Sequence, residues 1–194
     1  MSHKLGICIP YRNRKEHIDR LIPHLSNKLT EQGIEHTFYV GHQIDDKLFN
    51  RGAMKNIAAH YAFEDGCDYV AFHDVDMLPI DVDYNFSDVP LHLATDFTNE
   101  VRTSFEEYFG GVTMFPVDTF VEINGYSNKY WGWGFEDDDL LFRAANKKIA
   151  LDSKIIGKNE FKKLYGLSFN ANESYIKIPK KDLLDLITNI SKFG

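Results

Sequence analysis

The chain has 194 residues, of which 43% are hydrophobic and 14% are aromatic. That apolar share is enough to bury one core, so the composition favours a single globular domain and excludes a disordered chain. The formal net charge is −7, which argues against the basic surface that nonspecific nucleic-acid binding needs but still allows an anionic nucleotide to be held by a few local arginines.

Strand and helix patterns alternate along the first half of the chain. Short apolar runs predict strands at Leu5–Pro10, Thr37–Gly41 and Tyr69–Phe72. Helical spacing of apolar residues predicts helices over Lys15–Thr30 and Arg51–Asp65. This order predicts an α/β fold with a mostly parallel central sheet and helices on both faces. In such a fold, ligands bind at the carboxyl ends of the strands.

The second predicted helix has a clear start and an apolar side. Asn50 is a favourable N-cap residue directly before Arg51. Ile57, Ala58, Tyr61 and Ala62 fall on one face of this helix, so that face is expected to pack against the core.

The second half of the chain is less regular. Residues 81–102 are polar and are predicted to be irregular, and Tyr126–Phe135 is rich in glycine and aromatic residues and is predicted to be a loop. The predicted elements are a strand at Gly110–Pro116, a helix at Val117–Ile123, a helix at Glu136–Asn146, two short strands within Ile149–Ile156 and a terminal helix after Pro179.

The cysteines and the apolar runs argue against a secreted or membrane-spanning protein. Cys8 and Cys67 lie at or near predicted strands and are expected to be small buried side chains, with a disulfide as the alternative. No signal peptide precedes the first strand, and no apolar run reaches the roughly 18 residues of a membrane span. We therefore expect a cytoplasmic protein without a membrane span.

Asp74-Val75-Asp76 follows the third predicted strand. Side chains two residues apart in an extended segment point to the same side, so the two carboxylates are expected to lie close together. Carboxylate oxygens suit Mg²⁺ or Mn²⁺, and such an ion stabilises a departing diphosphate. A D-x-D triplet alone also fits a solvated turn, but its place at the end of a buried strand favours a ligand site.

Pro10-Tyr11-Arg12-Asn13-Arg14 follows the first predicted strand. The two arginines are suited to form forked hydrogen bonds with phosphate or with the edge of a base, and Tyr11 is suited to stack on a base. An exposed loop with solvated charges is the alternative interpretation.

Trp131-Gly132-Trp133-Gly134-Phe135 leads directly into four acids, Glu136 to Asp139. A helix dipole favours acids at a helix start, which accounts for the acids alone. It does not account for the two tryptophans separated by glycines. Tryptophan stacks on sugar faces and glycine lets a substrate approach the backbone, so these residues favour a sugar-binding surface. A carboxylate beside such a surface is suited to deprotonate a sugar hydroxyl as a general base.

Taken together, these motifs give the chain a family resemblance: it is similar to the β-1,4-galactosyltransferases, glycosyltransferase family 7. The stretches that carry the resemblance occur in the family's order and are Ile9–Arg14 with Glu16-His17, Phe49–Gly52, Phe72–Pro79, Tyr108–Val112, and Asn124-Gly125 through Trp131–Gly134 to Glu136–Asp139. They lie within residues 5–157. His73, before D-V-D, is most similar to the branch that adds galactose to xylose.

The resemblance implies a GT-A fold and an inverting transfer of galactose from UDP-galactose to a sugar hydroxyl of a glycan acceptor. It implies one domain over residues 1–194, with a nucleotide-binding part over about 1–80, an acceptor and catalytic part over about 81–160 and a C-terminal appendage over 161–194. A UDP-sugar and a saccharide are the expected partners, and any membrane association is expected to be peripheral, through the acceptor.

The family's functional positions carry over residue by residue. The expected UDP-sugar site comprises Pro10, Tyr11, Arg12, Arg14, Phe49, Arg51, Asp74 and Val75. The expected sugar-contacting positions are Tyr108, Gly110, Gly111, Trp131, Trp133 and Gly134. The resemblance implies that Asp137 is the general base, that Glu136 and Asp138 orient the sugars, and that Asp76 binds the metal. Tyr108 matches the position that favours galactose over N-acetylgalactosamine.

The chain departs from the family at the metal site. Family members supply a histidine ligand beyond the acidic helix, whereas the last histidine here is His92, and the corresponding residues 158–163 read KNEFKK. Mn²⁺ or Mg²⁺ is therefore expected to bind weakly without nucleotide, with Lys162 or Lys163 neutralising part of the diphosphate charge. Phe135 stands where a small or basic residue is usual and is expected to change the acceptor pocket.

Two other functions stay open at the level of sequence. A non-catalytic module that binds a sugar nucleotide or a glycan would explain the missing histidine, but it would not explain why Asp76, Asp137 and Asp138 are all present. A nucleotidyltransferase usually has a glycine-rich phosphate loop near the first strand, and Pro10–Arg14 contains no glycine.

Overall fold

The computed structural model describes residues 3–94, 96–97, 109–149 and 160–163, the second and fourth of these ranges by their backbone. A five-stranded sheet lies at its centre, in the order β2-β1-β3-β7-β5. The strands are β1 (Lys4–Tyr11), β2 (Glu35–His42), β3 (Tyr69–His73), β5 (Leu91–His92) and β7 (Val112–Pro116). The three long strands predicted in the first half of the chain are thus confirmed.

The direction of the strands is mostly parallel. β1 pairs in parallel with β2 and β3, whereas β7 runs antiparallel to both β3 and β5. Within the described sheet, β7 is therefore reversed relative to the other four strands. The reversal brings the start of β7 to the carboxyl end of β3, where His73 pairs with Val112.

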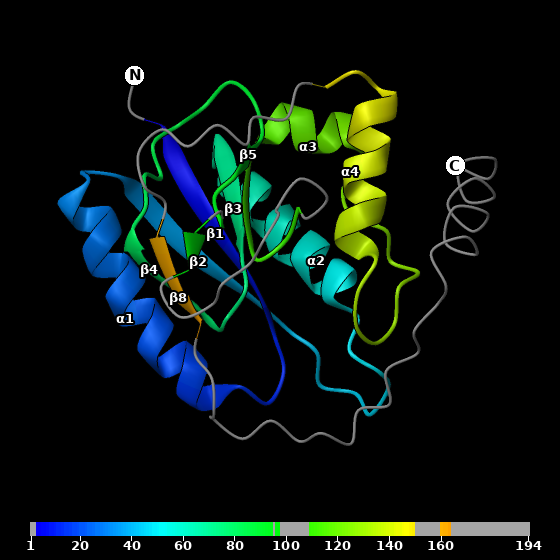
Figure 1. Ribbon diagram of the computed structural model, residues 1–194, viewed down its shortest axis with the longest axis horizontal. Helices are drawn as coiled ribbons and strands as arrows, with labels where there is room; N and C mark the ends of the chain where they lie inside the picture. The colour runs from blue at the N-terminus through cyan, green and yellow to red at the C-terminus, as the bar shows by residue number, and fades with distance from the viewer. Residues whose placement is uncertain (1–2, 95, 98–108, 150–159, 164–194) are drawn as a thin grey trace.

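Helices cover both faces of the sheet, as Figure 1 shows. The helices are α1 (Lys15–Glu31), α2 (Arg51–Glu64), α3 (Val117–Ile123) and α4 (Glu136–Asn146). Alternate strand residues face opposite layers: Ile7 of β1 belongs to the core under α1, and Cys8 belongs to the core shared with α2, α3 and α4. The predicted layering is confirmed, and the predicted bounds of α3 and α4 agree with those observed.

Helix α2 buries only part of the predicted face: Ala58 and Ala62 are buried as expected, whereas Ile57 and Tyr61 are not. Ile57 and Tyr61 are 47% and 57% exposed. The buried residues of α2 are Gly52, Lys55, Ala58, Ala59 and Ala62. The physical reason is that Arg51 and Lys55 both point to acids at the start of α4, and this charge pairing places a lysine in the buried stripe that apolar spacing alone would not select.

A second, three-stranded sheet has the order β4-β8-β6 and comprises β4 (Met77–Asp81), β6 (Asp96–Phe97) and β8 (Glu160–Lys163). None of these strands was predicted; β6 and the two-residue β5 lie in the segment expected to be irregular. Met77 of β4 pairs with Lys163 of β8, so β8 lies beside the residue that follows Asp76.

Several other predictions can be compared with the structure. Cys8 and Cys67 are buried free thiols, as the first interpretation had it, and they form no disulfide. Within the described part of the chain, no helix has the length and apolarity needed to cross a membrane. The strands expected within Ile149–Ile156 and the helix expected after Pro179 lie outside the described residues, apart from Ile149, which follows α4.

Candidate active site

A cavity of about 180 Å³ lies at the carboxyl ends of β1, β2 and β3, and its lining residues are Pro10, Arg12, Asn13, Arg14, Phe49, Arg51, Asp74, Val75, Asp76 and Trp133. The structure thus brings together most of the residues predicted for the donor and the metal, although they come from four separate segments. Tyr11 is the exception among the predicted donor residues: its ring packs edge-on against His42 at 4.8 Å between ring centroids.

Arg51, the first residue of α2, contacts carboxylates from two other segments. Its Nη1 lies 3.1 Å from Oδ2 of Asp74, its Nε lies 2.6 Å from Oε1 of Glu136, and its Nη2 donates to Oδ2 of Asp137. The guanidinium therefore joins the turn after β3 to the start of α4. Glu136 and Asp137, both predicted site residues, are held by it and are almost completely buried.

Lys55 is a site residue that sequence reasoning missed. Its Nζ donates to Oδ1 of Asp137 at 2.8 Å and lies 4.3 Å from the centre of the Tyr126 ring. The lysine is 2% exposed. The available signal was its spacing from Arg51, since residues four apart on a helix lie on the same face.

Burial and the neighbouring charges together shift the pKa values of Asp74 and Asp137 in opposite directions. Burial raises the pKa of Asp74 from 3.8 to about 6, although Arg51 and Lys55 oppose the shift. Burial would also raise the pKa of Asp137, but the charges of Arg51 and Lys55 outweigh it and lower the pKa below its ordinary value. Asp137 is therefore a carboxylate at neutral pH, which is the form that accepts a proton.

The tryptophan loop is tied to the start of α2. The amide of Gly132 donates to the carbonyl of Phe49 at 2.9 Å, and Nδ2 of Asn50 donates to the carbonyl of Asn128 at 2.7 Å. A Cβ on Gly52 would lie 2.6 Å from the carbonyl oxygen of Ser127, so this close approach requires glycine. These contacts bring the loop to the cavity.

The loop presents its tryptophans to solvent and enters α4 through strained backbone. Trp131 and Trp133 are 46% and 73% exposed, and Trp133 lines the cavity. Gly134 and Phe135 have φ of +94° and +73°, a region that a bulky residue rarely adopts and that often marks a functional site. The Phe135 side chain packs in a small cluster with Tyr130 and Phe142.

The glycines before β7 support the D-V-D turn. The carbonyl of Gly111 accepts a 2.9 Å hydrogen bond from the amide of Asp74. The carbonyl of Gly110 lies 2.9 Å from Nε2 of His92, whose pKa is lowered by burial. Asp138 is partly buried on α4, and Tyr108 lies outside the described residues.

His73 braces the same turn from within the core. It is fully buried, and burial lowers its pKa to about 4, so the ring is neutral. Its Nδ1 lies 3.0 Å from the Asp74 carbonyl, which can only accept, so Nδ1 carries the proton and Nε2 accepts from the Tyr84 hydroxyl at 3.1 Å.

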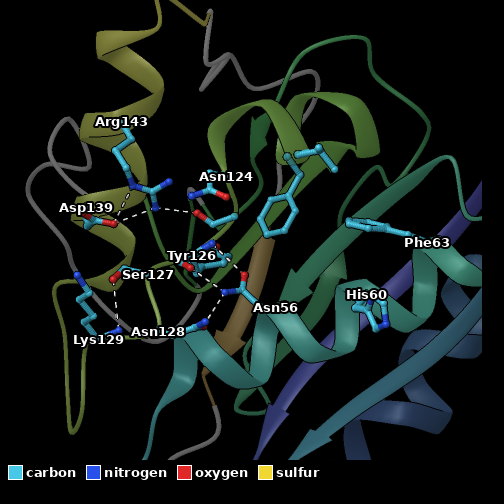
Figure 2. Close-up of a pocket in the computed structure, with 13 residues that line it drawn as sticks. Asn56, His60, Phe63, Asn124, Tyr126, Ser127, Asn128, Lys129, Asp139 and Arg143 are labelled. Atoms are coloured by element: carbon cyan, nitrogen blue, oxygen red, sulfur yellow. Dashed lines mark hydrogen bonds and ion pairs between the residues drawn. The ribbon is translucent and has the colours of Figure 1, made fainter. Parts of the chain in front are cut away.

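A larger cavity, of about 570 Å³, lies between α2, α3 and α4 (Figure 2). None of the predicted site residues is among the described residues that line it. Its polar groups hold the structure together: Asn56 bonds to Tyr126 and Asn128, and Arg143 bonds to Asp139 and to the carbonyls of the turn after α3, as the dashed lines in Figure 2 show in part. These bonds connect α2, the tryptophan loop and α4 around the cavity.

The carboxylates of the smaller cavity fit a hard divalent ion in part. Asp74 and Asp76 both line it, and Oδ1 of Asp74 is a buried acceptor with no hydrogen-bond partner among the described groups. The described residues contain no group of three or more histidine, cysteine or acidic side chains placed to hold a metal. Protein oxygens can thus supply a few ligands, and a diphosphate could supply others.

The chain matches models of known families over most of its length. Residues 1–88 match the N-terminal region of glycosyl transferase group 7, and residues 91–171 match the N-terminal domain of galactosyltransferase. Together with the sheet and its D-V-D cavity, these matches define a chain of the GT-A fold class. The chain belongs to the β-1,4-galactosyltransferase family, glycosyltransferase family 7.

Individual relatives agree with this assignment. The xylosylprotein 4-β-galactosyltransferase of Caenorhabditis elegans is 34% identical over 173 residues, covering 84% of this chain and 59% of that protein. The β-1,4-galactosyltransferase 4 of Mus musculus is 39% identical over 153 residues, covering 76% of this chain and 44% of that protein. The chain spans about half the length of the curated relatives it matches.

Solved structures show the same fold. The catalytic domain of Drosophila β-1,4-galactosyltransferase 7 in complex with xylobiose superposes with a TM-score of 0.80 at 28% identity, over 96% of this chain and 79% of that one. A variant of the Drosophila enzyme in complex with manganese, UDP-Gal and xylobiose also gives a TM-score of 0.80. The predicted GT-A fold is therefore confirmed.

Proposed function

We propose that this chain is an inverting galactosyltransferase that moves galactose from UDP-galactose to a sugar hydroxyl of a glycan acceptor. The observation that carries the proposal is the position of Asp137, a buried carboxylate bonded to Arg51, which itself lines the D-V-D cavity. A proton acceptor is thus joined by one side chain to the place where a nucleotide diphosphate would bind.

The donor would bind in the cavity at the strand ends. Arg12, Arg14 and Arg51 line it and supply the positive charge that a diphosphate requires. Arg12 is positioned from two sides, since its guanidinium donates to the Lys47 carbonyl and lies 5.2 Å from the centre of the Phe49 ring. The manganese and UDP-Gal bound by the Drosophila relative support this assignment.

Asp76 would be the main protein ligand of a divalent ion, Mn²⁺ or Mg²⁺. When bound, the ion would neutralise charge that develops on the departing diphosphate. The chain's own basic residues at the cavity, Arg12, Arg14 and Arg51, would share that task.

The acceptor would lie against the exposed tryptophans, with its reacting hydroxyl at Asp137. As the hydroxyl oxygen bonds to C1 of galactose, the bond from C1 to the diphosphate oxygen breaks and Asp137 takes the hydroxyl proton. The hydroxyl becomes acidic as this bond forms, so a carboxylate with a lowered pKa is a sufficient base. A xylose-terminated acceptor is the first candidate, because His73 resembles the xylose branch and xylobiose is bound by the Drosophila relative.

The test is release of UDP from UDP-galactose in the presence of xylose- and N-acetylglucosamine-terminated acceptors. We expect acceptor-dependent release, and a loss of about 10²–10⁴-fold in kcat for Asp137→Asn with UDP binding retained. Asp118→Asn is the matched control, because Asp118 is an exposed acid in the first turn of α3. Lack of release with every acceptor, despite UDP binding, would instead favour the non-catalytic binding module.

A further inference from the structure

Arg51 would gain a further anionic partner when a donor binds, in addition to the three carboxylates that it already contacts. Its Nη1, Nε and Nη2 already face Asp74, Glu136 and Asp137. It also lines the cavity proposed for the donor. A diphosphate entering that cavity would share the charge of the guanidinium with these carboxylates, so Arg51 alone would balance Asp137 less well once a donor is bound.

Lys55 also bonds to Asp137 but, unlike Arg51, does not line the donor cavity. It lies one helical turn beyond Arg51 and bonds to the other carboxylate oxygen, Oδ1, at 2.8 Å. It is 2% exposed, it is covered by the ring of Tyr126, and it is not among the residues that line the donor cavity. A diphosphate in the cavity therefore has no direct access to this ammonium.

The cover over Lys55 is itself fixed. The Tyr126 amide donates to Oδ1 of Asn56, the neighbour of Lys55 on α2, at 2.9 Å. The Tyr126 hydroxyl lies 3.3 Å from Oγ1 of Thr113 in β7. The lysine thus lies in a rigid, closed position between α2, the tryptophan loop and the sheet.

We propose that Lys55 is the positioning residue for Asp137: it holds one carboxylate oxygen in place while Arg51 turns to the donor diphosphate. This rests on the proposed function and adds a residue to it. The ionisable groups around Asp137 are Arg51 and Lys55 from α2, Asp74 after β3, His92 from β5, Tyr126 from the loop and Glu136 from α4. Once Arg51 is engaged by phosphate, Lys55 is the cation that still balances Asp137 in this set.

The kinetic test uses Lys55→Met, which keeps the length of the side chain and removes its charge. We expect kcat to fall about 100-fold, as for a misplaced catalytic group, with KM for UDP-galactose and the affinity for UDP unchanged. Lys55→Met added to Asp137→Asn should cause little further loss in kcat, because Lys55 acts through Asp137 and the two residues act as a unit. Lys15→Met is the control, since it removes an exposed lysine that pairs with Asp19 at 2.7 Å and should leave both constants unchanged.

A wild-type value of kcat in folded Lys55→Met would overturn the proposal. So would a loss of kcat in the double variant equal to the product of the two single-variant losses. A second measurement covers the case in which Lys55→Met does not fold. The Lys55 ammonium is observed by ¹H–¹⁵N NMR in the wild type, with and without UDP, and in Asp137→Asn. We expect a protected signal that persists with UDP and moves in Asp137→Asn.

The NMR and activity measurements distinguish the role of Lys55 from the proposed transfer reaction. Loss of the ammonium signal on UDP addition, or its indifference to Asp137→Asn, would overturn the role of Lys55 whatever the activity. Absence of UDP release by the wild type, with the NMR result as expected, would refute the proposed transfer reaction and leave the Lys55–Asp137 pairing intact.

Discussion

Asp74 is a site residue whose charged form is unfavourable in the folded protein. Its side chain is 13% exposed and contacts Arg51, but burial still raises its pKa to about 6. Its Oδ1 is buried with no hydrogen-bond partner among the described groups. A carboxylate in this state is destabilising in the folded protein until a cation or a donor ligand arrives.

The pH dependence of stability follows from that shift. A carboxyl whose folded pKa lies above its ordinary value binds more protons folded than unfolded, so its contribution to stability falls as pH rises from about 4 to 6. The shift from 3.8 to about 6 corresponds to roughly 3 kcal/mol. We therefore expect the stability of Asp74→Asn, relative to the wild type, to increase by about 2–3 kcal/mol between pH 4 and pH 7.

Urea unfolding at pH 4, 5, 6 and 7 would measure this difference. Asp88→Asn is the control, because Asp88 is exposed and outside the site, and its difference from the wild type should not change with pH. Parallel stability curves for Asp74→Asn and the wild type would show that Asp74 is not destabilised by burial.

At the scale of elements, the start of α2 connects the parts of the site. Asn50 is 2% exposed and caps the helix, since its Oδ1 accepts from the amide of Ala53 at 2.9 Å. The same side chain donates to the Asn128 carbonyl in the tryptophan loop. Asn50 thus caps the start of α2 and also bonds to the loop that leads to α4.

We expect Asn50→Ala to lower the free energy of unfolding by about 2 kcal/mol, about half from the lost cap and half from the lost bond to the loop. Asn50→Ser keeps a cap acceptor and loses the bond to Asn128, so it should lose about 1 kcal/mol. Chemical denaturation of both variants measures the two losses. Equal losses in Asn50→Ala and Asn50→Ser would mean that the cap contributes nothing.

The same element shows what sequence could and could not predict. The bounds of α2 and its Asn50 cap followed from local signals, and the D-V-D turn followed from a buried strand. The orientation of α2 did not, because the burial of Lys55 depends on Asp137, 82 residues away. The short strands β4, β6 and β8 were missed for the same reason: their pairing, such as Met77 with Lys163, is set by contacts distant in sequence.

At the scale of the whole molecule, the chain has the family's fold, and its sequence contains no histidine after His92. The last histidine, His92, faces the carbonyl of Gly110 inside the core. β8 lies beside β4, next to the D-V-D turn, and its sequence there is Glu-Phe-Lys-Lys. The sequence thus places basic residues in the segment where the family resemblance leads one to expect a ligand.

We therefore expect Mn²⁺ to bind appreciably only when UDP is present, because the phosphates supply missing ligands. Asp76→Ala should abolish this binding, and Asp88→Ala should not. Some UDP release should remain in the presence of a chelator, since lysines and arginines neutralise part of the diphosphate charge. Calorimetric titration of Mn²⁺ with and without UDP is the measurement, and tight binding to the free protein would reveal a further ligand.

The reversed strand β7 has an evolutionary consequence. Its start lies against the end of β3, and the amide of Asp74 bonds to the carbonyl of Gly111 through backbone atoms alone. On the proposed function, the donor-binding half and the acceptor-binding half of the chain therefore meet at a seam that depends little on side-chain identity. Substitutions in the acceptor half can therefore change which acceptor is bound while the backbone contacts to the nucleotide-binding half are kept.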